Sequence, residues 1–203
     1  KYGESRRTPA ISAPSEAIPT TNTSRPRNTG VTVSMELEEA IRTRRTFKAF
    51  RPDPVPRETL DELFELARWA PSHNLTNPWR FRVVGPEALA ALKQAAGPES
   101  APKLDRAPTL VVVSAAKTGD PVQDEEDLLA TGVASYIVLV AAHGRGLAGY
   151  WRTPGVLRTP EGRAAVGLPD DEHFVGLLHL GWCRQEKEAP ERAAAADFVT
   201  YLP

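Results

Sequence analysis

The spacing of hydrophobic residues switches between helical and strand patterns several times along the chain. Apolar residues three or four positions apart predict amphipathic helices, whereas alternating or short continuous apolar runs predict strands. We therefore expect helices at 35–44, 56–70, 87–96, 124–143 and 160–166. We expect strands at 79–84, 107–116, 147–152 and 173–182.

Particular residues indicate where two of these helices begin and end. Pro56 suits the first turn of a helix, and Pro71 stops the same helix because proline lacks the amide hydrogen that a helix requires. Thr159 is a favoured N-cap, Pro160 suits the first helical position, and Gly167 suits the position after the last turn. These signals support the bounds of both helices independently of the apolar spacing.

The longest helix should lie in the core. Its second half, "GVASYIVLVAA", is apolar nearly all round, and the four acids 124–127 should occupy its first turn, where the helix dipole favours anions. The strand at 173–182 is apolar enough to be central in a sheet. The β-prone residues 198–201 have no hairpin neighbour, so a strand there would need another edge, such as that of a second subunit.

Composition divides the chain into a tail and one domain. Residues 1–34 are rich in Pro, Ser, Thr and Arg and show no hydrophobic period, which favours an irregular N-terminal extension. Residues 35–203 are enough for a single domain with one core.

Charge and cysteine content narrow the class of protein. The formal net charge of −1 argues against a nucleic-acid coat, so any anion that binds should be small. The single Cys183 cannot form an internal disulfide, which fits a reducing compartment. We therefore expect the protein to be located in the cytoplasm. No run approaches the ~20 apolar residues that span a bilayer, and no signal peptide is visible, so we expect no membrane association.

Several catalytic motifs fail on inspection. The run "GRGLAG", residues 144–149, matches G-x-G-x-x-G, but a helix leads into it and a strand leaves it, the reverse of a dinucleotide-binding turn. A helix end followed by a tight turn explains it better. The four histidines show no metal-ligand spacing, and no serine-hydrolase elbow is present, so we expect neither a metal nor a hydrolytic nucleophile.

Three short clusters remain, each at the end of an expected element: Arg44–Thr46, residues 70–81 and residues 149–155. Taken singly, each arginine is explained as a solvated side chain and each tryptophan as core. Together they offer guanidinium, hydroxyl and amide donors beside flat apolar side chains. That combination suits a ligand with a phosphate and an aromatic ring system.

At these residues the sequence resembles the nitroreductase family of FMN-dependent oxidoreductases, in particular its small single-domain subgroup. The opening "AIRTRRTFKAFRPDPVP" is similar to the family's start, and "ARWAPSHNLTNPWRF" is similar to A-P-S-x-x-N-x-Q-P-W-x-F. "GYWRTP" and the closing "DFVTYLP" resemble the subgroup's versions. The similarity covers residues 35 to about 201.

The resemblance implies an α+β fold with a mostly antiparallel central sheet flanked by helices. It implies a homodimer with FMN at the interface and a C-terminal strand exchanged between the subunits. By resemblance, the residues that contact FMN are Arg44, Arg45, Thr46, His73, Asn77, Trp151, Arg152 and Thr153, with a weaker match at Arg192.

The resemblance also implies a reaction. Hydride passes from NAD(P)H through flavin N5 to a small electron-poor acceptor such as a nitroaromatic, quinone or enone, so no catalytic side chain is required. A cation near the flavin's pyrimidine edge, for which Arg45 or Arg152 is the candidate, would stabilise the charge of the reduced ring.

The sequence departs from the family at Leu75, where the family has asparagine, and at Asn77, where it has glutamine. The alternatives are a flavin- or small-ligand-binding protein without turnover, an arginine-rich binding module, and a family relative with another flavin reaction, such as dehalogenation or flavin fragmentation.

Overall fold

The computed structural model describes residues 35–185, 188 and 190–203. All the described helices and strands lie in one compact unit. The extension expected at 1–34 lies outside the described residues.

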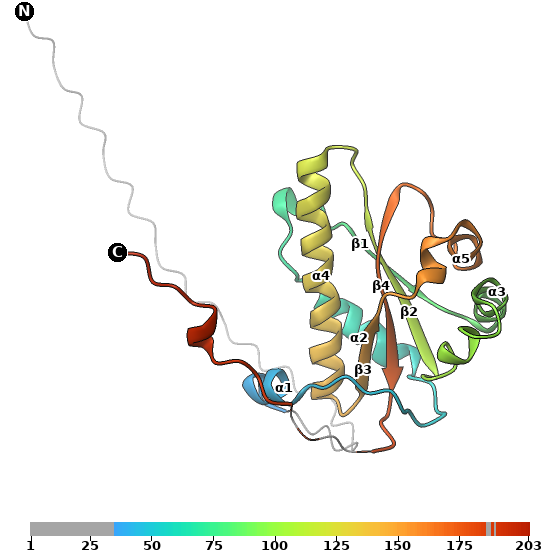
Figure 1. The fold of residues 1–203 in the computed structure, drawn as a ribbon, viewed down its shortest axis with the longest axis horizontal. Helices are drawn as coiled ribbons and strands as arrows, with labels where there is room; N and C mark the ends of the chain where they lie inside the picture. Colours follow the sequence, from blue (N-terminus) through green and yellow to red (C-terminus); the bar gives the residue numbers. More distant parts are fainter. Residues whose placement is uncertain (1–34, 186–187, 189) are drawn as a thin grey trace, which may run out of the picture. The chain divides into compact units, whose positions relative to one another are not determined.

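The core of this unit is one antiparallel sheet with the strand order β1-β2-β4-β3 (Figure 1). The strands are β1 (Trp79–Val83), β2 (Thr109–Ala116), β3 (Ala148–Arg152) and β4 (Glu172–Gly181). All four were predicted from the sequence, and β4 is internal as its composition indicated. Strand β2 is internal too, which explains why its residues are apolar without alternation.

In the described part of the chain, five α-helices surround the sheet, and all five were predicted. They are α1 (Leu37–Thr43), α2 (Arg57–Ala67), α3 (Pro86–Ala96), α4 (Pro121–Gly144) and α5 (Pro160–Ala165). Four short 3₁₀ turns complete the described structure: η1 (His73–Leu75), η2 (Ala101–Lys103), η3 (Gly155–Arg158) and η4 (Ala195–Asp197).

Side-chain caps fix the starts of two helices. The carboxylate of Asp120 accepts hydrogen bonds from the backbone amides of Val122 and Gln123, so α4 begins three residues earlier than predicted. Of the four acids expected in the first turn, only Asp124 lies there. Thr159 caps α5 as predicted, accepting from the amide of Gly162.

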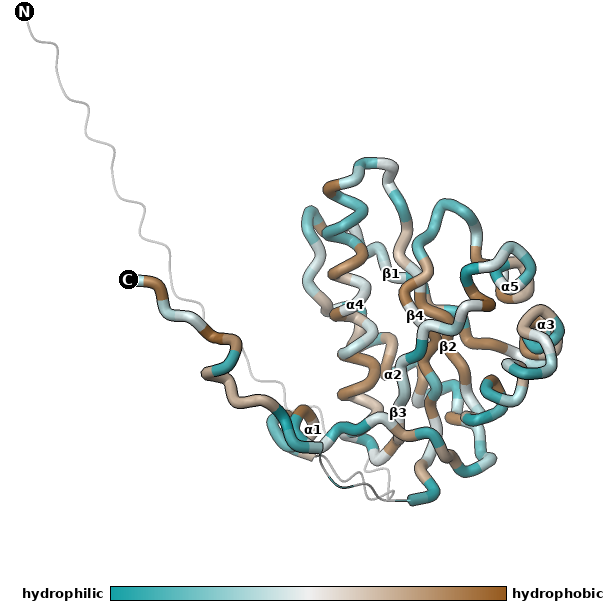
Figure 2. Tube along the Cα trace, viewed as in Figure 1, coloured by the Kyte–Doolittle hydropathy of each residue, from teal (hydrophilic) through white to brown (hydrophobic). Residues whose placement is uncertain are grey.

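The sheet separates two apolar clusters, because successive side chains of a strand point to opposite faces. One cluster contains Val111 and Val113 of β2 and packs against α2 and α4. The other contains Leu110 and Val112 and packs against α3 and α5. Figure 1 shows these helix pairs on either side of the sheet, and Figure 2 shows hydrophobic colouring concentrated on the strands between them.

Helix α4 lies against the core with one side, as predicted, and its other side is exposed. Ala134, Val138 and Ala142 are fully buried, whereas Leu129 is 66% exposed and Tyr136 is 40% exposed. By length and composition α4 also qualifies as a helix that could cross a membrane, contrary to the sequence-based expectation. A core helix passes the same test, and α4 contacts α2 and every strand of the sheet.

The C-terminal tail forms no strand in the single chain. Residues 198–203 have no ladder partner among the described strands, and Phe198 and Tyr201 are 73% and 91% exposed. A strand needs an edge to pair with, and this chain does not pair its own edge with the tail. The exchange of this segment with a second subunit stays a prediction.

Candidate functional site

The Arg44–Thr46 segment leaves α1 and continues beside the sheet edge. Arg44 has φ −57° and ψ 132°, which ends the helix, so the two arginine side chains need not diverge as they would on a helix. Thr46 forms a parallel bridge with Gly149 of β3, and the amide of Phe47 donates to the carbonyl of Gly149 at 3.2 Å. The segment is therefore positioned by an edge strand.

Both arginines carry buried donors that the described residues leave unsatisfied. Neither the Nε atom of Arg44 nor that of Arg45 has a hydrogen-bond partner there. Nη1 of Arg45 donates to the carbonyls of Arg42 and Arg44 at 2.6 and 2.9 Å, and the Arg44 guanidinium lies 5.8 Å from the ring centre of Tyr136. Because buried donors normally find acceptors, these two favour an anionic ligand, and a phosphate fits them.

His143, at the end of α4, adds to this picture. Its Nε2 lies 2.9 Å from the hydroxyl of Thr43, at the C-terminal end of α1. Burial lowers the pKa of His143, and the charges of Arg44 and Arg45 lower it further. The imidazole is therefore kept neutral, so the positive charge beside β3 belongs to the two arginines.

The predicted cluster at residues 149–155 lies at the end of β3, but its side chains point to different places. Trp151 packs in the cluster on the α4 face, and its indole N–H donates to the carbonyl of Val175 at 3.3 Å. Arg152 lies on the other face, where Nη1 donates to the carbonyl of Lys103 at 3.1 Å. Thr153 is exposed just after the strand.

The clusters at Arg44–Thr46 and at residues 149–155 are close together in one chain. Thr46 pairs with Gly149, which is two residues from Trp151, a separation of about 7 Å along a strand. A ligand lying along the edge of β3 could contact both. Since Arg152 points to the opposite face, Arg45 becomes the better candidate for a cation beside such a ligand.

The cluster at residues 70–81 contains a strained turn, residues 72–77, which we call the η1 loop. Three of its residues have positive φ although they are not glycine: Asn74 at 54°, Leu75 at 55° and Asn77 at 47°. Left-handed backbone costs about 1–2 kcal/mol for such a residue, and strain of this kind gathers at functional sites. Leu75, which departs from the family residue, is 79% exposed.

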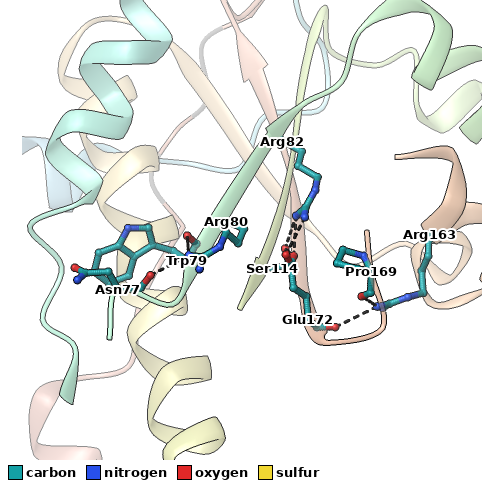
Figure 3. A network of polar contacts seen from close by, with 8 residues as sticks. All are labelled: Asn77, Trp79, Arg80, Arg82, Ser114, Arg163, Pro169 and Glu172. Atoms are coloured by element: carbon teal, nitrogen blue, oxygen red, sulfur yellow. Dashed lines mark hydrogen bonds and ion pairs between the residues drawn. The ribbon is translucent and has the colours of Figure 1, made fainter. Parts of the chain in front are cut away.

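Hydrogen bonds hold the η1 loop in this conformation. The hydroxyl of Thr76 donates to the buried carboxylate of Asp127 at 2.5 Å, and the side-chain amide of Asn77 donates to the carbonyl of Leu75 at 2.6 Å. Arg80 of β1 donates to the carbonyl of Asn77 at 3.0 Å, as Figure 3 shows. The loop is thus tied to α4 and to β1.

One chain does not bring the η1 loop to the arginines. The loop contacts α4 at Asp127, whereas Arg44 lies over Tyr136, nine residues further along the helix. At 1.5 Å per residue this is about 14 Å along the axis. His73 and Asn77 are exposed at their end of α4, and Arg192 is exposed in the tail.

An apolar groove lies between α1, α2 and α4. It has a volume of about 690 Å³ and includes Trp69, which is 76% exposed, and Tyr136, which is the residue beneath Arg44. The other apolar residues along it are Met35, Leu37, Ala40, Ile41, Leu66, Ile137, Val140 and Ala141. Exposed apolar surface of this extent marks an interaction site.

Sequence reasoning missed the role of Asp127, which it placed among the four acids expected in the first turn of the helix. Asp127 is 1% exposed and also accepts from the side-chain amide of Gln123 at 3.1 Å. The signal was available in the spacing, because Asp127 shares its helical face with the buried Ala130, Thr131 and Ala134.

A second polar network, between β1, β2 and β4, was also missed, and it serves the fold. Arg82 donates two hydrogen bonds to the carboxylate of Glu172, at 2.8 and 2.9 Å, and Ser114 donates to the same carboxylate (Figure 3). Burial raises the pKa of Glu172, but the hydrogen bonds from Arg82 and Ser114 outweigh it and leave the pKa below its usual value. Every charge in this network is compensated.

Comparison with known proteins agrees with the fold. The sequence profile described as "Nitroreductase family" matches residues 41–182. YfhC of Bacillus subtilis, whose name proposes an NAD(P)H nitroreductase, is 26% identical over 82% of this chain and 94% of its own.

Two solved structures share the fold. A nitroreductase-like family protein from Bacillus cereus superposes with a TM-score of 0.76 at 23% identity, over 85% of this chain and 99% of that one. NfnB from Sphingopyxis sp. strain HMH, an FMN- and NADPH-dependent nitroreductase, superposes with a TM-score of 0.71 at 19% identity, over 83% of this chain and all of that one.

Proposed function

Because this chain belongs to the nitroreductase family, we propose that it is an FMN-dependent oxidoreductase. The family and its NAD(P)H nitroreductase relatives support oxidoreduction in general. The finer proposal is that hydride passes from NAD(P)H to a small electron-poor acceptor, such as a nitroaromatic, quinone or enone. The observation that carries it is the pair of unsatisfied Nε donors of Arg44 and Arg45 beside β3.

In this proposal each cluster has a separate task. Arg44 and Arg45 bind the phosphate of FMN and Thr46 its ribityl chain, because charge-assisted hydrogen bonds from arginine suit phosphate oxygens. Trp151 supplies an apolar wall that keeps water away, and Thr153 offers a hydroxyl. Bound FMN would supply the electron relay between the two substrates, and no acid or base of the chain is needed.

A second copy of the chain would complete the site. His73 and Asn77 lie too far along α4 to join the arginines of their own chain, but a homodimer could place the η1 loop of one copy beside the arginines of the other. The exposed apolar groove between α1, α2 and α4 supports this assembly, since a partner would cover it. The apolar tail residues Phe198 and Tyr201 would be covered in the same way.

The experiment is an absorbance spectrum of the purified protein before and after NADPH. Flavin bands that bleach support the reductase, bands that persist support a carrier without turnover, and no bands refute the flavin site. Salt-sensitive retention on nucleic acid would instead favour a binding module.

Two matched variants test the site itself. Arg44→Ala should weaken FMN binding about ten- to a hundredfold, because one charge-assisted hydrogen bond contributes ~1.5–3 kcal/mol. Arg57→Ala removes an equally charged side chain that pairs with Asp61 on the exposed surface of α2, and it should retain FMN. If both variants retain FMN equally well, Arg44 does not belong to the FMN site.

A further inference from the structure

A second concave site lies on the face of the sheet opposite α4. It has a volume of about 490 Å³ and lies where the end of α3 and η2 meet the turn from β3 to η3. We call it the η2 pocket. Its polar lining residues are Ser100, Lys103, Arg152, Thr153 and Thr159, and the remaining ones are Ala95, Ala96, Leu104, Pro154, Gly155 and Val156.

The lining of the η2 pocket is positive and contains no carboxylate. Lys103 and Arg152 supply two cations, and three hydroxyl groups lie with them. Arg152 is held in place, because it donates to the carbonyl of Lys103 and its guanidinium lies 5.8 Å from the ring centre of Tyr150. Its remaining N–H groups have no partner among the described residues, so a preorganised donor faces the pocket region.

These cations also lack the acidic partners that other cations of the domain have. Lys93 pairs with Asp105 at 2.7 Å, and Arg82 pairs with Glu172 at 2.8 Å. Within the part of the chain that the structure describes, Lys103, Arg152 and the nearby Arg106 form no ion pair. In a chain with net charge −1, this is a local group of cations without ion-pair partners of their own.

A buried histidine beside the pocket responds to this charge. His179 of β4 is fully buried, lies 5.6 Å from Tyr150 between ring centres, and has no hydrogen-bond partner among the described residues. Burial is the main cause that lowers its pKa to about 3, and the charges of Arg152 and Arg106 lower it further. Both arginines therefore act on the same region of this sheet face.

We propose that the η2 pocket binds an oxyanion, a phosphate or carboxylate group, held by Lys103, Arg152 and the neighbouring hydroxyls. Two cations with adjacent hydroxyl donors and no competing acid suit such a group. The pocket adjoins the loop assigned to the flavin, since Thr153 lines it and follows Trp151 by two residues. On the proposed function, the oxyanion belongs to a substrate: a phosphate of NAD(P)H, or the carboxylate of an acceptor.

The binding step can be tested without any turnover. Inorganic phosphate is titrated into the full-length purified protein and followed by amide chemical shifts in ¹H–¹⁵N NMR spectra. We expect saturable shifts at Ser100, Lys103 and Thr153. Lys103→Gln should weaken phosphate binding about tenfold, because it removes one of two charges on the anion.

Lys117→Gln is the matched control, since it makes the same change at a lysine that lies outside the η2 pocket and donates to the carbonyl of Asp170. It should leave the phosphate affinity unchanged. Absence of saturable shifts, or equal weakening by the two variants, would overturn the site, since equal weakening means that only the overall charge matters.

Steady-state kinetics then identify the source of the oxyanion. If it is the 2′-phosphate of NADPH, Lys103→Gln raises the KM for NADPH but not for NADH; if it is the pyrophosphate, both KM values rise. If it is an acceptor carboxylate, only the KM for a carboxylated nitroaromatic rises, compared with a neutral one. Unchanged KM values for all of these would refute the substrate assignment.

Failure of the pocket and failure of the proposed function give different results. Each preparation is checked for flavin bands and for their bleaching by NADPH. A protein that bleaches normally but ignores phosphate refutes the η2 pocket alone. A protein that binds phosphate at the η2 pocket but holds no flavin refutes the proposed reaction and leaves the oxyanion site standing.

Discussion

Gly176 of β4 is where a single methyl group should disturb the fold and the candidate site together. The indole of Trp151 packs directly over it: a Cβ atom at position 176 would lie 2.0 Å from Nε1 and 2.6 Å from Cδ1. Non-bonded atoms prefer about 3.5–4.0 Å, so Gly176→Ala requires the indole to move by roughly 1.5–2 Å.

The surroundings of Trp151 make that movement costly. The far edge of the indole already lies against α4, since a Cβ atom at Gly132 would be 3.9 Å from it. Displacement would also lengthen the 3.3 Å hydrogen bond from the indole to the carbonyl of Val175. Overpacking costs about 1–3 kcal/mol and a lost hydrogen bond about 1 kcal/mol, so Gly176→Ala should lower the free energy of unfolding by ~2–4 kcal/mol.

Urea unfolding at one fixed protein concentration measures this loss, because any dimer makes stability depend on concentration. Gly155→Ala is the control, since a Cβ atom there meets no heavy atom within 4 Å and its φ lies outside the left-handed region. The reasoning fails if Gly176→Ala stays within about 0.5 kcal/mol of the wild type at an unchanged slope. If the proposed flavin site is right, the same variant should also retain less FMN.

Two further predictions concern the strained loop and pH. Leu75→Asn should raise the free energy of unfolding, measured in urea, by roughly 0.5–1 kcal/mol, because asparagine tolerates the φ of 55° better than leucine. The control Leu202→Asn, in the exposed tail, should leave the free energy of unfolding unchanged. The pKa of His179 falls to about 3 on folding, so between pH ~6.5 and 3 the unfolded chain binds a proton that the folded chain does not. The free energy of unfolding should therefore fall as pH drops from 6.5 towards 3, by at most ~1.4 kcal/mol per pH unit. His179→Phe should reduce the slope of stability against pH between pH 7 and 5. The lowered pKa of His143 still contributes to the slope in this range, whereas Glu172 does not yet titrate. An unchanged slope would refute the assignment of the pH dependence to His179.

The sequence located the elements because hydrophobic spacing reports burial. The face of α2 that contains Leu60, Leu63 and Ala67 is buried as its spacing predicted, and the cap of α5 is the predicted Thr159. Caps that act through a single side chain were harder to find: the start of α4 depends on Asp120, which the acids further along obscured.

The sequence did not reveal in which direction side chains point or how far apart the clusters lie. "GYWRTP" looks like one cluster, but strand alternation sends Trp151 and Arg152 to opposite faces of the sheet, and only the register of β3 shows which is which. In the same way, the sequence does not show that the η1 loop and the arginines contact α4 nine residues apart, about 14 Å along its axis. A tertiary hydrogen bond such as Thr76 to Asp127 joins residues 51 positions apart, and no local pattern predicts it.

These distances give the apolar groove a further meaning. Tyr136 lies in the groove and also beneath Arg44, so a surface that covers the groove must approach the unsatisfied arginine donors as well. If the proposed dimer forms there, its assembly and the binding of FMN share residues, and each must strengthen the other by the same factor. Added FMN should then shift a dissociating dimer back towards the dimer, and dilution should release FMN, whereas a site made by one chain alone would show neither effect.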